Sequence, residues 1–227
     1  MAIAFRASNK AVVTSGTSIT VTKPTGTTSG DILVVCLGAT TSRTLTPSDG
    51  ETWTEIQSGN STFTIWSYWH LCGGSEPASY SFSVAMGESS TRLSAIMAGL
   101  SGVDNTTPIN VSDEVLQTGT TINSPDITTT SDGCMILTCI VVNGTTTITD
   151  PTGFTFIDEI EGHDPDSAFS YMAQASAGAT GTLDWALADS RGARAHSIAL
   201  EPAAAAAGSV GVGLLENVLL ARRRLVN

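Results

Sequence analysis

The chain has three histidines, which are the first side chains to consider for catalysis or metal binding because imidazole titrates near neutral pH and ligates metals. His70 lies in a tryptophan-rich segment, His163 in an acidic loop and His196 on the last predicted strand. None stands at a spacing typical of a hydrolase, a phosphate-binding loop or a metalloprotease. The sequence therefore predicts a non-enzymatic protein with no catalytic residue, no bound metal and no cofactor, in which the histidines are structural or surface residues.

A dense group of carboxylates occupies residues 158–167, with the sequence Asp-Glu-Ile-Glu-Gly-His-Asp-Pro-Asp-Ser. Oxygen ligands at such short spacing could hold a calcium ion, but the segment lacks the regular pattern of a calcium-binding loop. We therefore expect a solvated acidic loop, and calcium binding stays open as the alternative. A glycan hydrolase would need two carboxylates facing each other across a cleft, and the spacing singles out no such pair.

Four cysteines are present, with no C-x-x-C pair and no histidine at ligand spacing from any of them. A zinc site formed by cysteines is therefore not expected. Cys36 and Cys139 lie within apolar runs and are predicted to be small core residues, while Cys72 ends a predicted strand. Cys134 and Cys139 are five positions apart on one predicted strand, so they should point to opposite faces and cannot bridge each other.

Aromatic side chains offer another kind of site, because their faces can stack on sugar rings. Trp66 and Tyr68 lie on a strand predicted over residues 62–72 and are the first candidates for contact with a glycan. Most of the aromatic residues alternate with apolar neighbours, however, which favours packing in the core.

The element that must position all these residues is a continuous apolar strand that occurs twice. Residues 33–37 follow a Gly-Asp turn, and residues 136–140 repeat their pattern 103 positions later. Apolar runs of this length are typical of strands buried on both faces. The aligned pairs are Cys36 with Cys139, Trp66 with Phe169, Tyr68 with Tyr171, Trp69 with Met172 and, after a shift of one residue, Arg92 with Arg194 and Ile96 with Ile198.

This repetition predicts an all-β fold, an antiparallel jelly-roll-like β-sandwich built from two tandem, sequence-related halves and followed by a short C-terminal α-helix. The expected divisions are residues 1–102 for the first half, 103–202 for the second and 203–227 for a linker and the helix. Each copy is long enough to form a small sandwich of its own. We favour one larger sandwich, because an isolated small one would leave one face of each apolar strand in water.

The chain is acidic, with a formal net charge of −11 at pH 7. A body of this charge repels phosphates, so nucleic-acid binding is not expected. No apolar stretch of membrane-spanning length and no secretory leader is recognisable, so membrane association is not expected either.

The C-terminal segment is predicted to be a short amphipathic helix used for assembly. Its apolar residues recur at helical spacing, and an arginine cluster interrupts them. Because so short a helix is marginal in water, we expect it to anchor the protein or to associate with copies of itself. The predicted assembly interface comprises Leu214, Leu215, Val218, Leu219, Arg222, Arg223, Arg224 and Leu225.

Several segments together resemble a known group of proteins. They are Gly-Asp-Ile-Leu-Val at 30–34, Pro-Ser-Asp-Gly-Glu-Thr-Trp at 47–53, Ser-Glu-Pro-Ala-Ser-Tyr at 75–80 and Leu-Ser-Gly-Val-Asp-Asn-Thr-Thr-Pro-Ile at 100–109. Over residues 16–202 the chain is similar to β-sandwich structural proteins of tailed-phage virions, of the tail, fibre, minor structural or decoration type, with related domains in bacterial surface proteins.

This resemblance implies a non-enzymatic component located in the virion, without catalytic residues or cofactors. The implied partners are other virion proteins and further copies of the chain, and we expect a homo-oligomer, with a trimer as the working expectation. The alternative is a carbohydrate-binding or adhesion module of a bacterial cell surface. In that case a host surface glycan would be the partner, and Trp66 and Tyr68 would be its contacts.

Overall fold

The computed structural model describes residues 2–85 and 88–204, and every regular element in these ranges is a β-strand. All the strand pairs are antiparallel, which confirms the predicted all-β, antiparallel class. No helix in this part of the chain is long and apolar enough to cross a membrane. The predicted C-terminal helix and its interface residues lie outside the described residues.

The first half forms one large and one small sheet. The large sheet has the strand order β1-β8-β3-β6-β5, and the small sheet has the order β2-β7-β4. The alternation of Tyr80, Phe82 and Val84 with serines in β7 turns one face of the small sheet toward the large one. The strands are β1 (Ala4–Gly16), β2 (Ser18–Thr22), β3 (Ile32–Ala39), β4 (Leu45–Pro47), β5 (Thr54–Asn60), β6 (Thr64–Leu71), β7 (Ser79–Val84) and β8 (Thr91–Ser101).

The second half repeats this arrangement. Its large sheet has the order β12-β16-β11-β14-β13, with β9 also paired to β16, and β10 pairs with β15. The end of β9 pairs with the start of β16 in the same register in which β2 pairs with β7. The strands are β9 (Ile109–Ser124), β10 (Thr128–Thr129), β11 (Cys134–Val142), β12 (Ile148–Thr149), β13 (Thr155–Ile160), β14 (Asp166–Gln174), β15 (Gly178–Ala179) and β16 (Leu183–Leu200).

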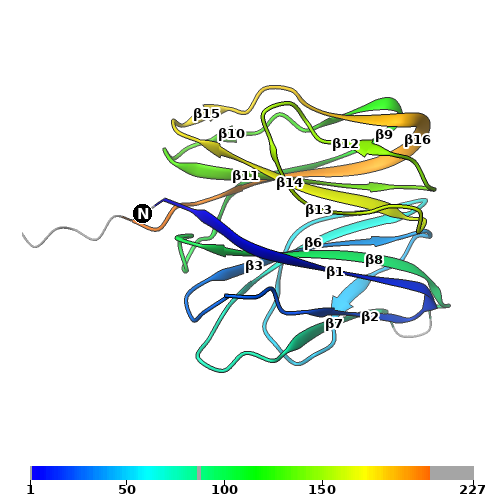
Figure 1. The fold of residues 1–227 in the computed structure, drawn as a ribbon, viewed down its shortest axis with the longest axis horizontal. Helices are drawn as coiled ribbons and strands as arrows, with labels where there is room; N and C mark the ends of the chain where they lie inside the picture. Colours follow the sequence, from blue (N-terminus) through cyan, green and yellow to red (C-terminus); the bar gives the residue numbers. More distant parts are fainter. Residues whose placement is uncertain (1, 86–87, 205–227) are drawn as a thin grey trace, which may run out of the picture.

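The two large sheets face each other and enclose a shared core, with the first half below and the second half above in Figure 1. Val34 and Cys36 of β3 lie in this core together with Leu137 and Cys139 of β11. The other faces of β3 and β11 pack against the outer strands of their own half. Each apolar strand is therefore buried on both faces, as its composition predicts, and the molecule combines the two expected arrangements: each half has its own outer layer, and both share a central core.

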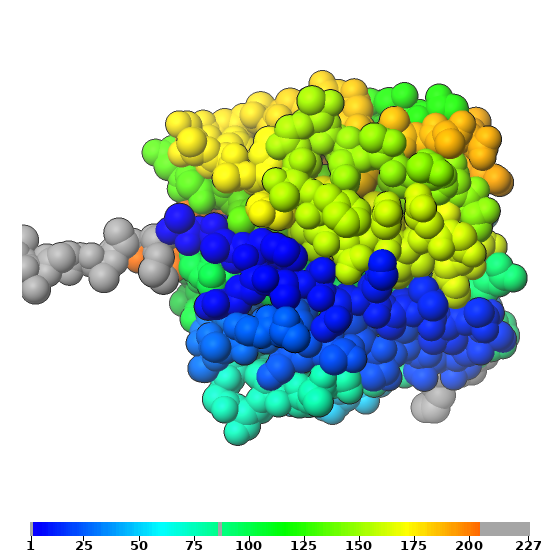
Figure 2. All heavy atoms as spheres, in the orientation of Figure 1, coloured from blue at the N-terminus to red at the C-terminus, as the bar shows by residue number. Residues whose placement is uncertain are grey.

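Polar contacts close the edge of this shared core. Strand β1, dark blue in Figure 2, lies along the second half beside residues of β13. Lys10 of β1 forms an ion pair of 2.9 Å with Asp158 of β13, and the Ser8 hydroxyl donates to the same carboxylate at 3.1 Å. The N-terminal strand therefore links the two halves along their boundary.

The pairing of β3 and β11 with β6 and β14 corrects part of the sequence alignment. Cys36 pairs with Ser67, whereas Cys139 pairs with Phe169. The residue of the first half that is equivalent to Phe169 is therefore Ser67, and the predicted match of Phe169 with Trp66 is wrong by one residue. A shift of one residue moves a side chain to the opposite face of a sheet. This is why Trp66 packs inside the first half while Phe169 lies in the shared core.

The same comparison corrects the alignment of the last strand of each half. Cys36 pairs with Ile96 on β8, and Cys139 pairs with His196 on β16. The predicted match of Ile96 with Ile198 is therefore wrong by two residues, as is that of Arg92 with Arg194. A shift of two preserves the face, so Ile96 and Ile198 both lie in the shared core although they are not equivalent.

Gly38 lies at a close approach between the two halves, and we expect Gly38→Ala to destabilise the protein. A Cβ at this position would lie 2.6 Å from Ser94 Oγ and 2.9 and 3.1 Å from the two methyl groups of Val141 in the other half. The serine can rotate away, but neither methyl can without moving the other. The expected loss is about 1–3 kcal/mol in the free energy of unfolding, measured by urea titration.

Gly74→Ala is the matched control for this substitution. A Cβ at position 74 meets nothing within 4 Å, so the change should stay within about 0.5 kcal/mol. Equal effects at the two positions would contradict the close contact between the halves at Gly38.

Candidate functional site

The structure places the two predicted glycan contacts in the interior. Trp66 is 9% and Tyr68 is 4% exposed. Their rings stack on each other at 6.0 Å between centroids, and their polar atoms donate hydrogen bonds to the backbone oxygens of Arg43 and Leu45. The prediction of glycan contact by these residues is wrong, because neither ring face is available to a sugar, whereas the prediction of core packing is correct.

The acidic segment 158–167 is more ordered than a solvated loop. Asp166 is fully buried and accepts hydrogen bonds from the backbone amides of Thr146, at 2.8 Å, and His163, at 3.0 Å. Asp164 accepts from Arg92 at 3.3 Å. The expectation of a solvated loop is therefore wrong for Asp166, whose carboxylate anchors the loop to its neighbours.

A second polar group is buried between the halves. The Ser67 hydroxyl lies 2.7 Å from His196 Nδ1 and 3.8 Å from the Cys139 sulfur. Burial raises the pKa of the Cys36 thiol, which hydrogen-bonds to Cys139. All four cysteines are free thiols, and the prediction that Cys36 and Cys139 are core residues is correct. Ser67, Cys139 and His196 have at most trace exposure, so this group lies beyond the reach of a substrate.

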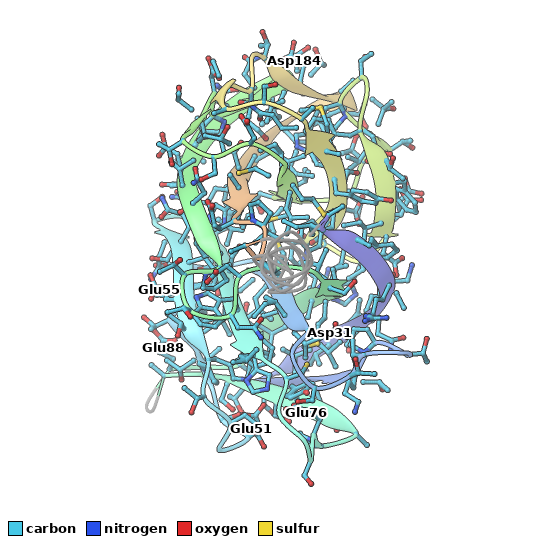
Figure 3. The ribbon with its side chains drawn as sticks, turned by 90° about the vertical axis from the view of Figure 1, so that its left-hand side faces the viewer. Asp31, Glu51, Glu55, Glu76, Glu88 and Asp184 are labelled. Atoms are coloured by element: carbon cyan, nitrogen blue, oxygen red, sulfur yellow. The ribbon has the colours of Figure 1, made fainter. Side chains whose placement is uncertain are left out.

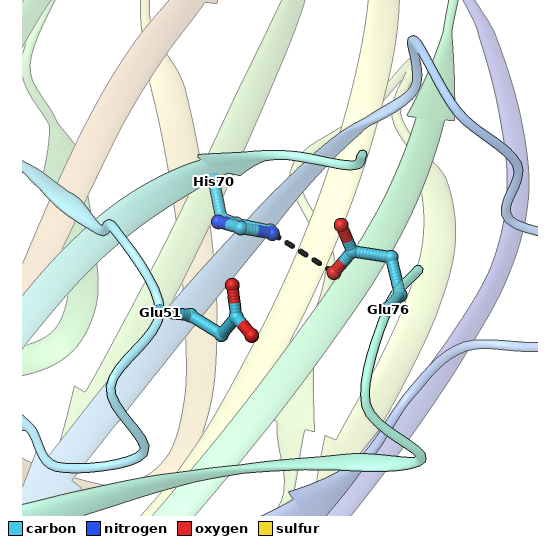
Figure 4. Close-up of side chains that lie close together, drawn as sticks. All are labelled: Glu51, His70 and Glu76. Atoms are coloured by element: carbon cyan, nitrogen blue, oxygen red, sulfur yellow. Dashed lines mark hydrogen bonds and ion pairs between the residues drawn. The ribbon is translucent and has the colours of Figure 1, made fainter. Parts of the chain in front are cut away.

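A further cluster of chemically capable side chains consists of Glu51, His70 and Glu76, drawn in Figure 4. His70 lies on β6, Glu51 in the loop between β4 and β5, and Glu76 in the loop between β6 and β7. One carboxylate or imidazole atom from each residue lies within 4.8 Å of the others. The two glutamates lie close together at the end of the first half that is remote from Asp184 of the second half (Figure 3).

Two turns hold the glutamates in place. The Asp49 carboxylate accepts from the Glu51 amide at 2.9 Å and from the Ser81 amide of β7 at 3.1 Å, which ties the first turn to the small sheet. The Glu76 carboxylate accepts from the Gly73 amide and thereby closes its own loop. Both turns contain Gly, Pro and Ser residues that favour such geometry, and the first also contains Asp49.

Hydrogen bonds define the chemical state of the cluster. His70 Nδ1 lies 2.9 Å from the Thr52 carbonyl oxygen, and Nε2 lies 2.9 Å from a carboxylate oxygen of Glu76. A carbonyl oxygen only accepts, so Nδ1 carries a proton and Nε2 is the atom that faces the carboxylates. The Tyr80 hydroxyl donates to the same Glu76 oxygen.

These contacts keep Glu76 ionised. Burial alone would raise the pKa of Glu76, but hydrogen bonds from Tyr80, from the Gly73 amide and from His70 outweigh it, so the pKa lies below its ordinary value. Burial and the neighbouring Glu76 carboxylate raise the pKa of Tyr80, so the phenol remains a donor.

A cavity of about 460 Å³ opens beside the cluster and is lined by Glu51, His70, Glu76 and the half-buried Trp69. On the inner side, the Trp53 ring lies 5.1 Å from the His70 ring and 5.3 Å from the Tyr80 ring. The imidazole is thus fixed between an aromatic wall and a water-accessible opening.

Sequence reasoning missed this cluster because its members are 6 to 25 positions apart and come from three segments. The one available signal was the strand alternation, which places His70 on the same face as Trp66 and Tyr68. Because this face of the strand is buried, a histidine at its end needs a fixed hydrogen-bond partner.

Comparisons with known proteins add no constraint at this point, because no protein-family model, curated protein or solved structure matches the chain. The class that the structure defines is an antiparallel, all-β protein of the sandwich kind.

Proposed function

We propose that this protein is a non-enzymatic structural component of a tailed-phage virion, displayed as a decoration, fibre or tail module and attached or self-associated through its C-terminal segment. The observation that carries the proposal is the shared core, which joins two β-sandwich halves into one body. A module that carries mechanical load, or that is displayed on the surface of a particle, needs a rigid body of this kind. The phage assignment itself depends on the sequence resemblance.

The strand order supports the finer description of the two-part sandwich as jelly-roll-like. In the first half the sheets β1-β8-β3-β6-β5 and β2-β7-β4 alternate along the chain, so consecutive strands repeatedly cross between layers. This winding of antiparallel strands over two sheets is typical of jelly rolls, which are common in capsid proteins.

The positions of the chain ends suit attachment at one end. The start of β1 and the segment around residue 203 both lie at the left end of the body in Figure 1. Ala203 is held there by a backbone hydrogen bond from its amide to the Gly102 oxygen, at 2.8 Å. An attachment segment after this point would leave the remaining surface of the β body free for solvent or partners.

Deletion of residues 208–227 is expected to leave a folded body and to abolish assembly. The deletion removes the whole predicted interface but none of the strands. Thermal unfolding should keep its midpoint, while the mass measured by light scattering should fall from that of an oligomer to that of one chain, and incorporation into particles should be lost.

Asn217→Ala in the full chain is the control, because it changes a polar position inside the same segment without touching the predicted interface. Its mass and incorporation should equal those of the unmodified protein. Truncated protein that still enters particles would defeat the proposal.

The carbohydrate-binding alternative is less well supported. It depended on exposed faces of Trp66 and Tyr68, and both side chains are buried. An adhesion module of this fold would have to recognise its glycan through other residues.

A further inference from the structure

We propose that Glu51, His70 and Glu76 bind a divalent transition-metal ion, with Zn²⁺ as the ion that their ligand set fits. The site is independent of the virion assignment and would exist whatever the protein is attached to. It supplies one imidazole nitrogen and two carboxylates, the ligand types that zinc takes from proteins, with the remaining positions open to water from the cavity.

The orientation of His70 is the first argument. Metal-binding histidines characteristically donate their other ring N–H to a backbone carbonyl or carboxylate, which fixes the tautomer and directs the free lone pair at the ion. In His70, Nδ1 donates to the Thr52 carbonyl at 2.9 Å and Nε2 faces the carboxylates. Nε2 donates its proton to Glu76 in the metal-free protein, and a bound ion would displace this proton and take its place. The side chain of His70 is only 5% exposed, so the ring has little freedom to turn away.

The distances are the second argument. Two ligands in tetrahedral geometry, each about 2.1 Å from one zinc ion, lie about 3.4 Å apart. The observed separation of His70 Nε2 and the Glu76 oxygen is 2.9 Å, and all three ligand atoms lie within 4.8 Å of one another. Rotation of the half-buried Glu51 side chain would bring its carboxylate inward from this spacing of at most 4.8 Å by up to about 1.4 Å, while the His70–Glu76 pair would widen by about 0.5 Å to admit the ion.

The charge of Glu51 is the third argument. Within residues 2–85 and 88–204, no hydrogen bond or ion pair reaches its carboxylate, although it points toward His70 (Figure 4). Glu76 has three donors, so Glu51 contributes a negative charge that the protein leaves uncompensated. A cation at this position removes the repulsion between the two carboxylates.

The second half shows that the fold does not require these residues. His70 pairs with Leu33, and the equivalent Ile136 pairs with Met172. Phe154 packs where Trp53 packs in the first half, and Thr152 stands two residues before it, as Glu51 stands before Trp53. The same architecture therefore forms with a thioether and a hydroxyl in place of the imidazole and the carboxylate, so the polar cluster is a feature added to one copy.

Titration of EDTA-treated, full-length protein with Zn²⁺, followed by calorimetry, tests the site. We expect saturable binding of one ion per chain, a rise of the thermal midpoint with zinc concentration, and a shift of one histidine Nε2 resonance in nitrogen NMR spectra. Mg²⁺ should not compete, because imidazole is a poor ligand for it.

Glu51→Gln is the decisive variant, because it removes a ligand and leaves the hydrogen bonds of His70 and Glu76 in place. It should weaken zinc binding at least ten-fold without lowering the thermal midpoint of the metal-free protein, because it also removes the repulsion between the two carboxylates. Glu161→Gln, at an exposed carboxylate of the second half, is the matched control and should bind zinc like the unmodified chain.

Zinc binding that is unsaturable, or that falls equally in both variants, would show weak association with the acidic surface and overturn the proposal. Unmodified affinity in Glu51→Gln would also overturn it, and His70 and Glu76 would then form an ion pair only.

Discussion

Leu137→Ala is expected to lower the free energy of unfolding by about 2–5 kcal/mol, the range for truncating a buried leucine. Leu137 lies on β11 in the second half and is fully buried in the shared core. Its removal leaves a cavity against strands of both halves, which cannot collapse because two sheets hold its walls apart. The substitution should therefore destabilise the first half as well as the second.

The tryptophans provide a way to observe each half separately. Trp53, Trp66 and Trp69 are in the first half, and Trp185 is in the second. In a Trp185→Phe background, tryptophan fluorescence reports the first half alone. Adding Leu137→Ala to this background should shift the urea midpoint seen by fluorescence and that seen by circular dichroism by the same amount.

Leu116→Ala is the control, because Leu116 on β9 is 47% exposed and its truncation should change stability by less than about 0.5 kcal/mol. If Leu137→Ala left the urea midpoint seen by fluorescence unchanged but shifted the midpoint seen by circular dichroism, the halves would unfold independently. The shared core would then contribute little to stability, and the rigid-body argument for the function would fail.

Trp185→Ala is expected to be at least as damaging, with a loss of about 3–5 kcal/mol. Trp185 is the largest fully buried side chain among the described residues; it lies at the start of β16 and belongs to the same buried cluster as Ile140 and Val142 of β11. Its indole N–H donates to the hydroxyls of Ser124, at 3.1 Å, and Thr138, at 3.2 Å. Truncation removes both the packing and this donor.

Trp185→Phe separates the two contributions. Phenylalanine keeps most of the apolar volume, and Ser124 and Thr138 still bond to each other at 2.9 Å, so only about 1–2 kcal/mol should be lost. Both variants are compared by urea unfolding monitored with circular dichroism. Equal losses in the two would mean that the hydrogen bond, rather than the packing, stabilises this core.

The proposed zinc site would stabilise only the first half, because its three ligands come from two loops and β6 of that half. An ion would fasten the turn around residue 50 and the loop around residue 75 to the large sheet. These loops lie at the end of the molecule away from the shared core (Figure 3). Core packing and metal binding would therefore stabilise opposite sides of the same half.

The sequence by itself determined the strands, their class and the repeat. The predominantly apolar runs at 32–37 and 136–140 are most stable in the middle of a sheet covered on both sides, and β3 and β11 are buried in that way. The separation of Cys134 from Cys139 onto opposite faces also followed from strand geometry alone, and the two lie in different cores.

Tertiary structure decided the register and the site. A one-residue difference in a loop is invisible in an approximate repeat, yet it exchanged the faces of Trp66 and Phe169, because only pairing with β3 and β11 sets the register. The meeting of Glu51, His70 and Glu76 likewise depended on where two loops end relative to a strand. Local sequence determines the conformation of each segment, whereas the distance between segments depends on the packing of the whole body.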